Sequence, residues 1–264
     1  MNSKAEKLAA FGRLLDIMDT LRAECPWDKK QTFESLRHLT IEETYELGDA
    51  ILSGDRTEIK KELGDLLLHI VFYSKLGSEE EAFDLADVAN EICEKLIYRH
   101  PHIYGDVKVK DEAEVKKNWE ALKLKEGKKT VLGGVPKGLP ALVKAQRIQD
   151  KAAGVGFDWE NATQVWEKVK EELDEFQLEV QKGDLKKSEE ELGDVLFSLI
   201  NYARFLKINP DTALEHTNRK FIQRFNTMEA EVEQKGKFLQ DLDLEELEDL
   251  WEKAKNQVSS SEDS

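Results

Sequence analysis

The sequence predicts an all-α protein built from two tandem helical-bundle domains. Along nearly the whole chain of 264 residues, apolar side chains recur at the three- and four-residue spacing of one helix face. Proline, which interrupts helices, occurs only five times, whereas Lys, Glu and Leu are abundant. One acidic pattern occurs twice without a gap, at an offset of 129 residues. Because each copy is long and has its own set of helices, the repeat indicates a duplicated bundle and not a solenoid.

The first half is expected to contain four long helices and a short one that carries Trp119. The second and third helices are separated only by Ser53, Gly54 and Asp55, which favours a tight turn between antiparallel neighbours. Pro101 ends the fourth helix, because proline cannot continue the helical hydrogen-bond ladder. The four long helices are predicted at residues 4–24, 33–52, 56–76 and 79–99.

Residues 124–140 form the clearest boundary, because they contain four glycines and two prolines and lack a periodic apolar face. After them the same order of helices returns at residues 161–182, 185–206 and 211–235, and a last helix carries Trp251. The polar end of the chain favours disorder. We therefore predict an N-terminal domain at 1–123, a linker at 124–140, a C-terminal domain at 141–258 and a disordered tail at 259–264.

Composition excludes several classes of protein. The net charge of −16 argues against binding to nucleic acids or anionic membranes, since both partners are polyanions. It does not exclude a small anionic substrate that is held through metal ions. No stretch has the apolar length of a signal peptide core or a membrane span. The two cysteines, Cys25 and Cys93, show no disulfide pattern, so we expect reduced thiols in a cytoplasmic protein.

The residues that the repeat preserves are largely acids. Glu43 and Glu46 are three residues apart, as are Glu62 and Asp65, so each pair shares a helix face. The short turn between their helices lets all four carboxylates converge on one pocket. Such anions repel one another unless some are protonated or a cation binds, and their oxygens suit Mg²⁺, Mn²⁺ or Ca²⁺. The matching residues of the second half are Glu172, Glu175, Glu191 and Asp194.

A solvated helix face is the simpler explanation for either acidic string alone, because Glu is abundant in this chain. The recurrence in register favours a metal site, and so does the position of Asp65 and Asp194 directly before the most apolar helical segments. A basic pair and a Trp–Lys pair follow each acidic set. They could be surface and core residues, or they could bind phosphate, sugar and base. They are Lys95, Arg99, Trp119 and Lys123 in the first half and Lys220, Arg224, Trp251 and Lys255 in the second.

The remaining motifs narrow the type of site. No histidine has Glu three residues before it, which argues against a ferritin-like di-metal bundle. The phosphate-binding pattern GxxxxGK[ST] does not occur. Gly64 and Gly193 lie inside predicted helices, where glycine is unfavourable. Close packing of helices is the ordinary explanation for them, and space for a ligand beside the metal is the alternative.

The pattern EExxE followed by ExxD resembles the all-α nucleoside triphosphate pyrophosphohydrolases, and the full chain resembles the MazG family. Six separate segments carry this resemblance, in the order expected for that family, and they cover nearly the whole chain. The segments are CPWDKKQTFESLRHLTIEETYEL, ELGDLLLHIVFY, RHPHIYGD, NWEALK, GVPKGLPALVKAQRIQDKAAGVGFDW and ELGDVLFSLINYARFL.

The resemblance implies two tandem MazG-type domains in a homodimer whose four-helix bundles are completed across chains. It also implies hydrolysis of nucleoside triphosphates to the monophosphate and pyrophosphate, with Mg²⁺ as cofactor and Mn²⁺ as the alternative. Glu172, Glu175, Glu191 and Asp194 would then hold the metal, and one of the glutamates would instead act as the base. The positions expected to hold the nucleotide are Lys168, Lys187, Lys220, Arg224, Trp251 and Lys255.

The second half has more groups that suit a nucleotide. At the offset of the repeat, Lys168, Lys187 and Asn201 stand where the first half has Leu39, Glu58 and Phe72. We therefore expect the second half to be the main catalyst, with broad base specificity, and the first half to be a weaker or regulatory site. Two other functions stay open. One is a non-catalytic nucleotide-sensing or dimerisation module, and the other is a dUTP- or phosphoribosyl-ATP-directed hydrolase of the same fold.

Overall fold

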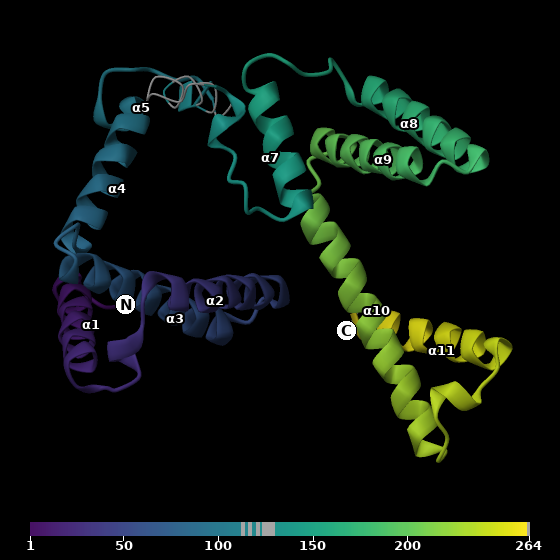
Figure 1. The fold of residues 1–264 in the computed structure, drawn as a ribbon, viewed down its shortest axis with the longest axis horizontal. Helices are drawn as coiled ribbons and strands as arrows, with labels where there is room; N and C mark the ends of the chain where they lie inside the picture. Colours follow the sequence, from purple (N-terminus) through teal and green to yellow (C-terminus); the bar gives the residue numbers. More distant parts are fainter. Residues whose placement is uncertain (112–113, 116–117, 120–121, 123–129, 263–264) are drawn as a thin grey trace. The chain divides into compact units, whose positions relative to one another are not determined.

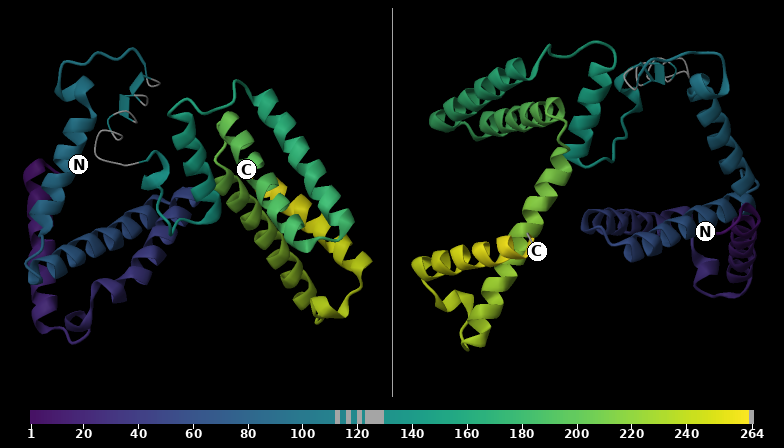
Figure 2. Two further views of the ribbon diagram at one scale, coloured as in Figure 1. Left: turned by 45° about the horizontal axis from the view of Figure 1, so that its top comes forward. Right: turned by 180° about the vertical axis from the view of Figure 1, so that it is seen from behind.

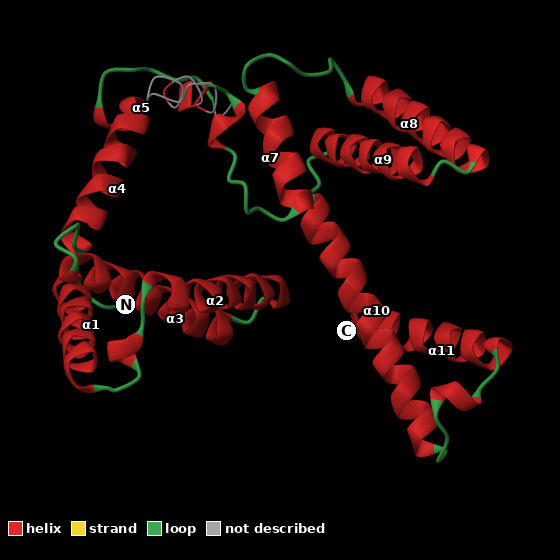
Figure 3. Cartoon of the chain, in the orientation of Figure 1, coloured by secondary structure: helices red, strands yellow, loops and turns green. Residues whose placement is uncertain are grey.

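A computed structural model describes residues 1–264 except 112–113, 116–117, 120–121, 123–129 and 263–264 (Figure 1). Within the described residues all regular secondary structure is helical, which confirms the predicted fold class (Figure 3). No helix in this part of the chain is long and apolar enough to cross a membrane. The chain divides into two compact units, Met1–Lys110 and Asp111–Ser264.

This division reflects how the chain packs and not where the repeated sequence begins. The described residues between 111 and 123, which we assigned to the N-terminal domain, group with the second unit. Lys123 and residues 124–129 of the predicted linker lie outside the described residues. In the rest of the linker, the only helical turn is η2 (Leu132–Gly134). The domain boundaries drawn from the repeat therefore stay a prediction.

The first unit contains the four long helices predicted for it, with one large difference in their bounds, and it adds the short elements η1 and α5. Ser3 and Thr32 begin the first two long helices, because their hydroxyl oxygens accept from the backbone N–H groups of Glu6 and Ser35. The buried core joins α1, α2 and α3 through Met18, Leu36, Val71, Phe72 and Leu76. The elements are α1 (Lys4–Glu24), η1 (Asp28–Lys30), α2 (Phe33–Ser53), α3 (Arg56–Glu79), α4 (Leu85–Arg99) and α5 (Pro101–Tyr104).

The difference is the start of the fourth helix, which we predicted at residue 79 and which begins at Leu85. The third helix continues to Glu79, and a turn with Glu81 at a φ of 54° follows. Asp84 then caps α4 by accepting from the backbone N–H groups of Ala86 and Asp87. Apolar spacing continues through this turn, so periodicity alone did not reveal it.

Two helical hairpins, α2–α3 and α8–α9, are the structural form of the sequence repeat (Figure 1). Helix α8 (Ala162–Lys182) and helix α9 (Leu185–Phe205) pack against each other as α2 and α3 do. Gly54 and Gly183 end the first helix of each hairpin with φ values of 73° and 74°, in the left-handed region that favours glycine. Asp55 and Asp184 then cap the second helix. The repeated Gly-Asp pair is therefore explained by the turn and not by catalysis.

Replacing Gly183 by alanine is expected to lower the free energy of unfolding by about 1 kcal/mol, because a Cβ atom is unfavourable at positive φ. Gly183→Asn is the matched control and should cost less, since asparagine tolerates the left-handed region better than other residues with a Cβ. Urea unfolding of both variants measures the difference. Equal losses from the two substitutions would mean that backbone conformation does not explain this glycine.

The second unit contains one helix that we did not assign. This helix, α7 (Ala141–Ala153), buries Gln149 and Lys151. The hairpin core includes Val165, Val169 and Val195. The other elements of this unit are α10 (Pro210–Gln234), η3 (Leu239–Asp241) and α11 (Leu244–Glu262). The structure thus continues α11 through residues 259–262, where we predicted the start of a disordered tail.

Candidate functional site

Three carboxylates of the second hairpin converge as the spacing predicted. Glu172 and Glu175 come from α8 and Glu191 from α9, and one oxygen of each lies within 4.8 Å of the others. Glu172 is only 8% exposed, whereas Glu175 lies on the surface. Asp194 is one turn further along α9 and is not in this close group, although its charge acts on Glu191. We call Glu172, Glu175 and Glu191 the second acidic cluster.

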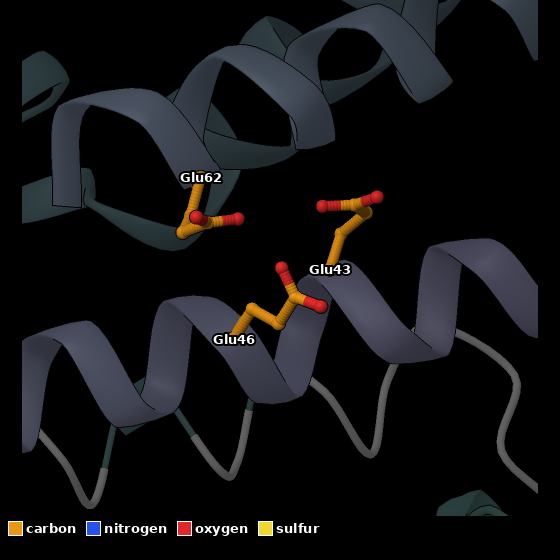
Figure 4. A group of neighbouring side chains, drawn as sticks. All are labelled: Glu43, Glu46 and Glu62. Atoms are coloured by element: carbon orange, nitrogen blue, oxygen red, sulfur yellow. The ribbon is translucent and has the colours of Figure 1, made fainter. Parts of the chain in front are cut away.

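The first hairpin repeats this arrangement with Glu43, Glu46 and Glu62, which we call the first acidic cluster. Figure 4 shows the side chains of Glu43 and Glu46 on one helix directed toward Glu62 on its neighbour. Glu62 is 3% exposed, and its Oε2 atom is buried without a hydrogen-bond partner. Asp65 again contributes through its charge and not as a member of the close group.

The electrostatics of the two clusters also correspond. Burial and the neighbouring charges of Asp65, Glu46 and Glu62 raise the pKa of Glu43. Slight burial and a ring of neighbouring carboxylates raise the pKa of Glu191. That ring consists of Glu175, Asp194, Glu172 and Glu179. Each cluster therefore holds more negative charge than is favourable without a counter-charge.

A lysine supplies part of the counter-charge in each half, but from a different helix. Lys168 lies one turn before these glutamates on α8, and its Nζ lies 2.8 Å from Glu171 Oε1 and 2.8 Å from Glu172 Oε1. These contacts raise the pKa of the Lys168 ammonium, so it stays charged. In the first half, Lys61 on α3 lies 3.0 Å from Glu62 Oε1. The lysine that contacts the cluster therefore lies on the first helix of the hairpin in the second half, and on the second helix of the hairpin in the first half.

The residues present fit a hard divalent cation. All donors are carboxylate oxygens, which Mg²⁺, Mn²⁺ and Ca²⁺ prefer to nitrogen or sulfur ligands. They come from two helices held by a capped turn, so their positions depend little on loop motion. The buried, unpartnered oxygen of Glu62 is an acceptor that a bound cation would satisfy. Both observations favour a metal site over a solvated face.

The predicted basic and aromatic groups of the second half form their own cluster on α10 and α11. Arg224 lies over the indole of Trp251 at 5.8 Å, and Phe221 packs on the same ring at 5.0 Å. The Nε atom of Arg224 is buried without a hydrogen-bond partner. Lys220 lies one turn before Arg224 on α10, and Lys255 pairs with Glu252 at 3.3 Å. We call Lys220, Arg224, Trp251 and Lys255 the basic–aromatic cluster.

The structure does not bring the basic–aromatic cluster to the second acidic cluster within one chain. Figures 1 and 2 show α11 packed against α10, and α11 has no extensive contact with α8 or α9 in the described residues. The groups that shift the pKa of Glu191 all belong to α8 and α9. That these residues jointly bind one nucleotide therefore stays a prediction.

The other predicted substrate residues have varied positions. Lys187 is exposed on the first turn of α9, where its backbone N–H is bonded to Asp184. Asn201 is half-buried on α9 and accepts from Arg204 Nε at 3.0 Å. In the first half, Lys95 and Arg99 lie on α4, outside the hairpin that carries the acids. Trp119 lies outside Met1–Lys110, and Lys123 is beyond the described residues.

The two helical glycines do not serve close packing within the chain. Among the residues that the structure describes, a Cβ atom added at Gly64 or at Gly193 would meet no heavy atom within 4 Å. Close approach of another described helix of the same chain therefore does not explain these glycines. The open space beside them leaves room for a ligand or for a second copy.

The sequence repeat is also the part of the chain that a protein-family model recognises. The MazG nucleotide pyrophosphohydrolase domain matches residues 31–104 and again residues 161–228. These segments contain both acidic clusters and together cover more than half of the chain. The chain belongs to the MazG family.

Individual MazG relatives match over almost the full length. A nucleoside triphosphate pyrophosphohydrolase of Escherichia coli (strain K12) is 42% identical over 254 residues, covering 93% of this chain and 97% of that protein. The nucleoside triphosphate pyrophosphohydrolase/pyrophosphatase MazG of Thermotoga maritima is 44% identical over 250 residues, covering 93% and 95%. The uncharacterized protein YabN of Bacillus subtilis (strain 168) is 45% identical over 260 residues, which cover 96% of this chain and 53% of YabN.

One acid of this MazG chain was missed by motif reasoning. Glu179 lies on α8 one turn after Glu175, its charge helps to raise the pKa of Glu191, and its Oε2 atom is buried without a hydrogen-bond partner. Its other oxygen lies 2.6 Å from Lys182 Nζ. The first half has Ala50 at the matching position, so the repeat did not reveal it. The four-residue spacing from Glu175 was the available signal.

Stability of the MazG hairpins should depend on pH in a defined direction. Folding raises the pKa of Glu43 and Glu191 above the usual 4.5, so the folded chain binds protons more tightly than the unfolded chain. In EDTA, the contribution of these groups to the free energy of unfolding should fall as pH rises from about 4.5 through their raised pKa values. Mg²⁺ should reduce this fall. Urea unfolding across pH, with and without Mg²⁺, measures it.

Glu191→Gln is the control for this pH dependence. It removes one titrating group while keeping the shape of the side chain, so it should flatten the fall seen in EDTA. If neither Mg²⁺ nor this substitution changes how the free energy of unfolding depends on pH, repulsion among these carboxylates does not destabilise the fold.

Proposed function

We propose that this chain hydrolyses nucleoside triphosphates to nucleoside monophosphates and pyrophosphate, with Mg²⁺ as cofactor and Mn²⁺ as a substitute. The observation that carries the proposal is the convergence of Glu172, Glu175 and Glu191 from two capped helices. The printed names of the Escherichia coli and Thermotoga maritima relatives support the reaction. Broad use of several bases remains part of the proposal by likeness to the family.

In the proposed mechanism Glu172, Glu175, Glu191 and Asp194 would hold the metal, whose charge would neutralise the triphosphate oxygens and favour attack of water at the α-phosphorus. Lys168 is placed to exchange a carboxylate contact for a phosphate oxygen, because its Nζ already lies at the edge of the cluster. One carboxylate of the cluster accepts the proton of the attacking water. Pyrophosphate then leaves from the α-phosphorus as the new P–O bond forms.

We propose that the second half is the main catalyst. Its Lys168 lies on the same helix face as Glu172, whereas the first half has Leu39 at that position. The additional carboxylate of Glu179 also has no equivalent in the first half. The first acidic cluster is complete, so we propose a weaker or regulatory cation and nucleotide site there.

We also propose that the active protein is a homodimer. Leu192, Leu196 and Leu199 form an apolar stripe on α9 that is 40–51% exposed in the single chain. Leu63 and Ile70 repeat it on α3, with exposures of 52% and 48%. A second copy would cover these stripes and complete each bundle. It would also bring its own basic–aromatic cluster to the acidic cluster, where the guanidinium of Arg224 would contact a phosphate oxygen.

Steady-state kinetics test the proposal directly. The purified chain with Mg²⁺ should release pyrophosphate from ATP, GTP, CTP, UTP and their deoxy forms over many turnovers. Binding without turnover would support the non-catalytic nucleotide-sensing module instead. Turnover of dUTP or phosphoribosyl-ATP alone would support the narrower hydrolase, and release of orthophosphate would contradict the proposed bond cleavage.

A further inference from the structure

In the second hairpin, one lysine contacts both a carboxylate of the acidic cluster and a carboxylate outside it. Lys168 Nζ lies 2.8 Å from Oε1 of Glu172, the buried member of the second acidic cluster. The same Nζ lies 2.8 Å from Oε1 of Glu171, which is exposed and does not belong to the cluster. A buried carboxylate is unfavourable without a positive partner, so Lys168 supplies the charge that Glu172 needs when no metal is bound.

The first hairpin has the same arrangement, made from other residues. Lys61 Nζ lies 3.0 Å from Oε1 of Glu62, which is the buried member of the first acidic cluster. It also lies 3.5 Å from Oε2 of Glu58, an exposed acid outside the cluster. In both hairpins, therefore, a lysine pairs with the most buried acid of the cluster and has a second carboxylate within reach.

The sequence repeat does not account for this correspondence. At the offset of 129 residues, Lys168 matches Leu39 and Lys61 matches Glu190. The two lysines also lie on different helices of their hairpins, on α8 and on α3. Because the duplication did not carry either lysine into the other half, a shared physical requirement explains the arrangement better. That requirement is a positive charge on the buried carboxylate of the metal-free protein.

A lysine at this position and a divalent cation exclude each other. Mg²⁺ binds carboxylate oxygens at about 2.1 Å, so a metal on Glu172 would lie close to an ammonium that stays 2.8 Å from the same carboxylate. The two positive charges would repel each other. The cation therefore displaces the lysine from the buried acid. The exposed acid, Glu171, leaves the displaced ammonium with a partner.

We propose that Lys168 and Lys61 are internal counter-ions that compete with the divalent cation for the buried carboxylate of each acidic cluster. The proposal rests on the proposed function, because it takes the clusters to be cation sites. Each lysine raises the free cation concentration at which its site fills. The effect is larger for Lys168, whose side chain is 33% exposed, than for Lys61 at 60%, because solvent weakens an exposed ion pair.

Calorimetric titration with Mg²⁺ alone, without nucleotide, tests the second site. All proteins in this comparison carry Glu62→Gln, which removes the buried acid of the first cluster, so the titration reports the second cluster. Adding Lys168→Met keeps the length of the side chain and removes its charge, and it should lower the Kd for Mg²⁺ about fivefold. The reciprocal comparison, Lys61→Met in a Glu172→Gln background, should lower the Kd about twofold.

Lys170→Met is the matched control for Lys168→Met. Lys170 lies on the same helix, but it pairs with Glu167 at 2.6 Å, and neither residue belongs to the cluster. The substitution removes the same charge from the chain without freeing a carboxylate of the site. At about 0.15 M salt, which screens distant charges, it should leave the Kd for Mg²⁺ nearly unchanged.

Thermal unfolding gives an independent answer. Lys168→Met should unfold at a lower temperature than the wild type in EDTA, because the carboxylates have then lost their counter-ion. Saturating Mg²⁺ should restore the unfolding temperature, since the metal takes over the same charge. A lysine that serves only the packing of α8 would instead lower the unfolding temperature equally in EDTA and in Mg²⁺.

Equal Mg²⁺ affinity of the Lys168→Met and Lys170→Met proteins would overturn the proposal, even if the wild type releases pyrophosphate. Weaker binding after loss of Lys168 would also overturn it, and so would the absence of Mg²⁺ binding in every variant. If the wild type releases no pyrophosphate but loss of Lys168 alone strengthens Mg²⁺ binding, the proposed function fails and the competition stands.

Discussion

Glu172→Gln is expected to reduce pyrophosphate release about 10²- to 10³-fold, as observed when one electrostatic stabiliser of a transition state is removed. Glutamine keeps the shape of the buried side chain but removes the charge that would hold the cation and that pairs with Lys168. The matching change in the first half, Glu43→Gln, should reduce the rate far less. Steady-state assays of both variants at saturating Mg²⁺ measure the difference.

Thermal unfolding serves as the control for these two variants. Removing one charge relieves the repulsion within each acidic cluster, so neither variant should unfold at a lower temperature in EDTA. If Glu43→Gln abolishes activity and Glu172→Gln retains it, the assignment of the catalytic half is reversed. If both variants retain full activity, neither acidic cluster is the catalytic site.

The second large effect is the rescue of activity by mixing two inactive variants. We expect Glu172→Gln and Arg224→Met each to be inactive, because the first lacks a metal ligand and the second lacks the guanidinium of the basic–aromatic cluster. If each site takes its acids from one copy and its Arg224 from the other, a mixed dimer has one intact site. Random pairing gives about half mixed dimers, so the mixture should regain about a quarter of wild-type activity.

A mixture of Glu172→Gln with Glu191→Gln is the matched control for the rescue. Both substitutions lie in the α8–α9 hairpin, so in a mixed dimer each site takes its acids from a defective copy. That mixture should stay inactive. If Glu172→Gln with Arg224→Met also stays inactive after exchange of subunits, the basic–aromatic cluster does not complete the site of a partner.

The hairpins and their acids were predictable because they depend on local rules. A left-handed glycine followed by an aspartate cap sets the turn, and three-residue spacing sets the helix face. Glu172, Glu175 and Glu191 therefore converge as predicted. The start of α4 was missed because its signal, the Asp84 cap, is weaker than the apolar period that runs through it.

The positions of the other site residues could not be derived from sequence in the same way. Whether Arg224 and Trp251 lie near the acids depends on the angle between α10 and the α8–α9 hairpin. Matched spacing in two repeats does not predict that angle.

Hydrolysis of ATP in ¹⁸O-labelled water tests the central claim most directly. If carboxylate-bound Mg²⁺ favours attack of water at the α-phosphorus, mass spectrometry should find one ¹⁸O atom in AMP and none in pyrophosphate. The label should depend on Mg²⁺ and be lost in Glu172→Gln. Label in pyrophosphate, or in orthophosphate formed together with ADP, would contradict it.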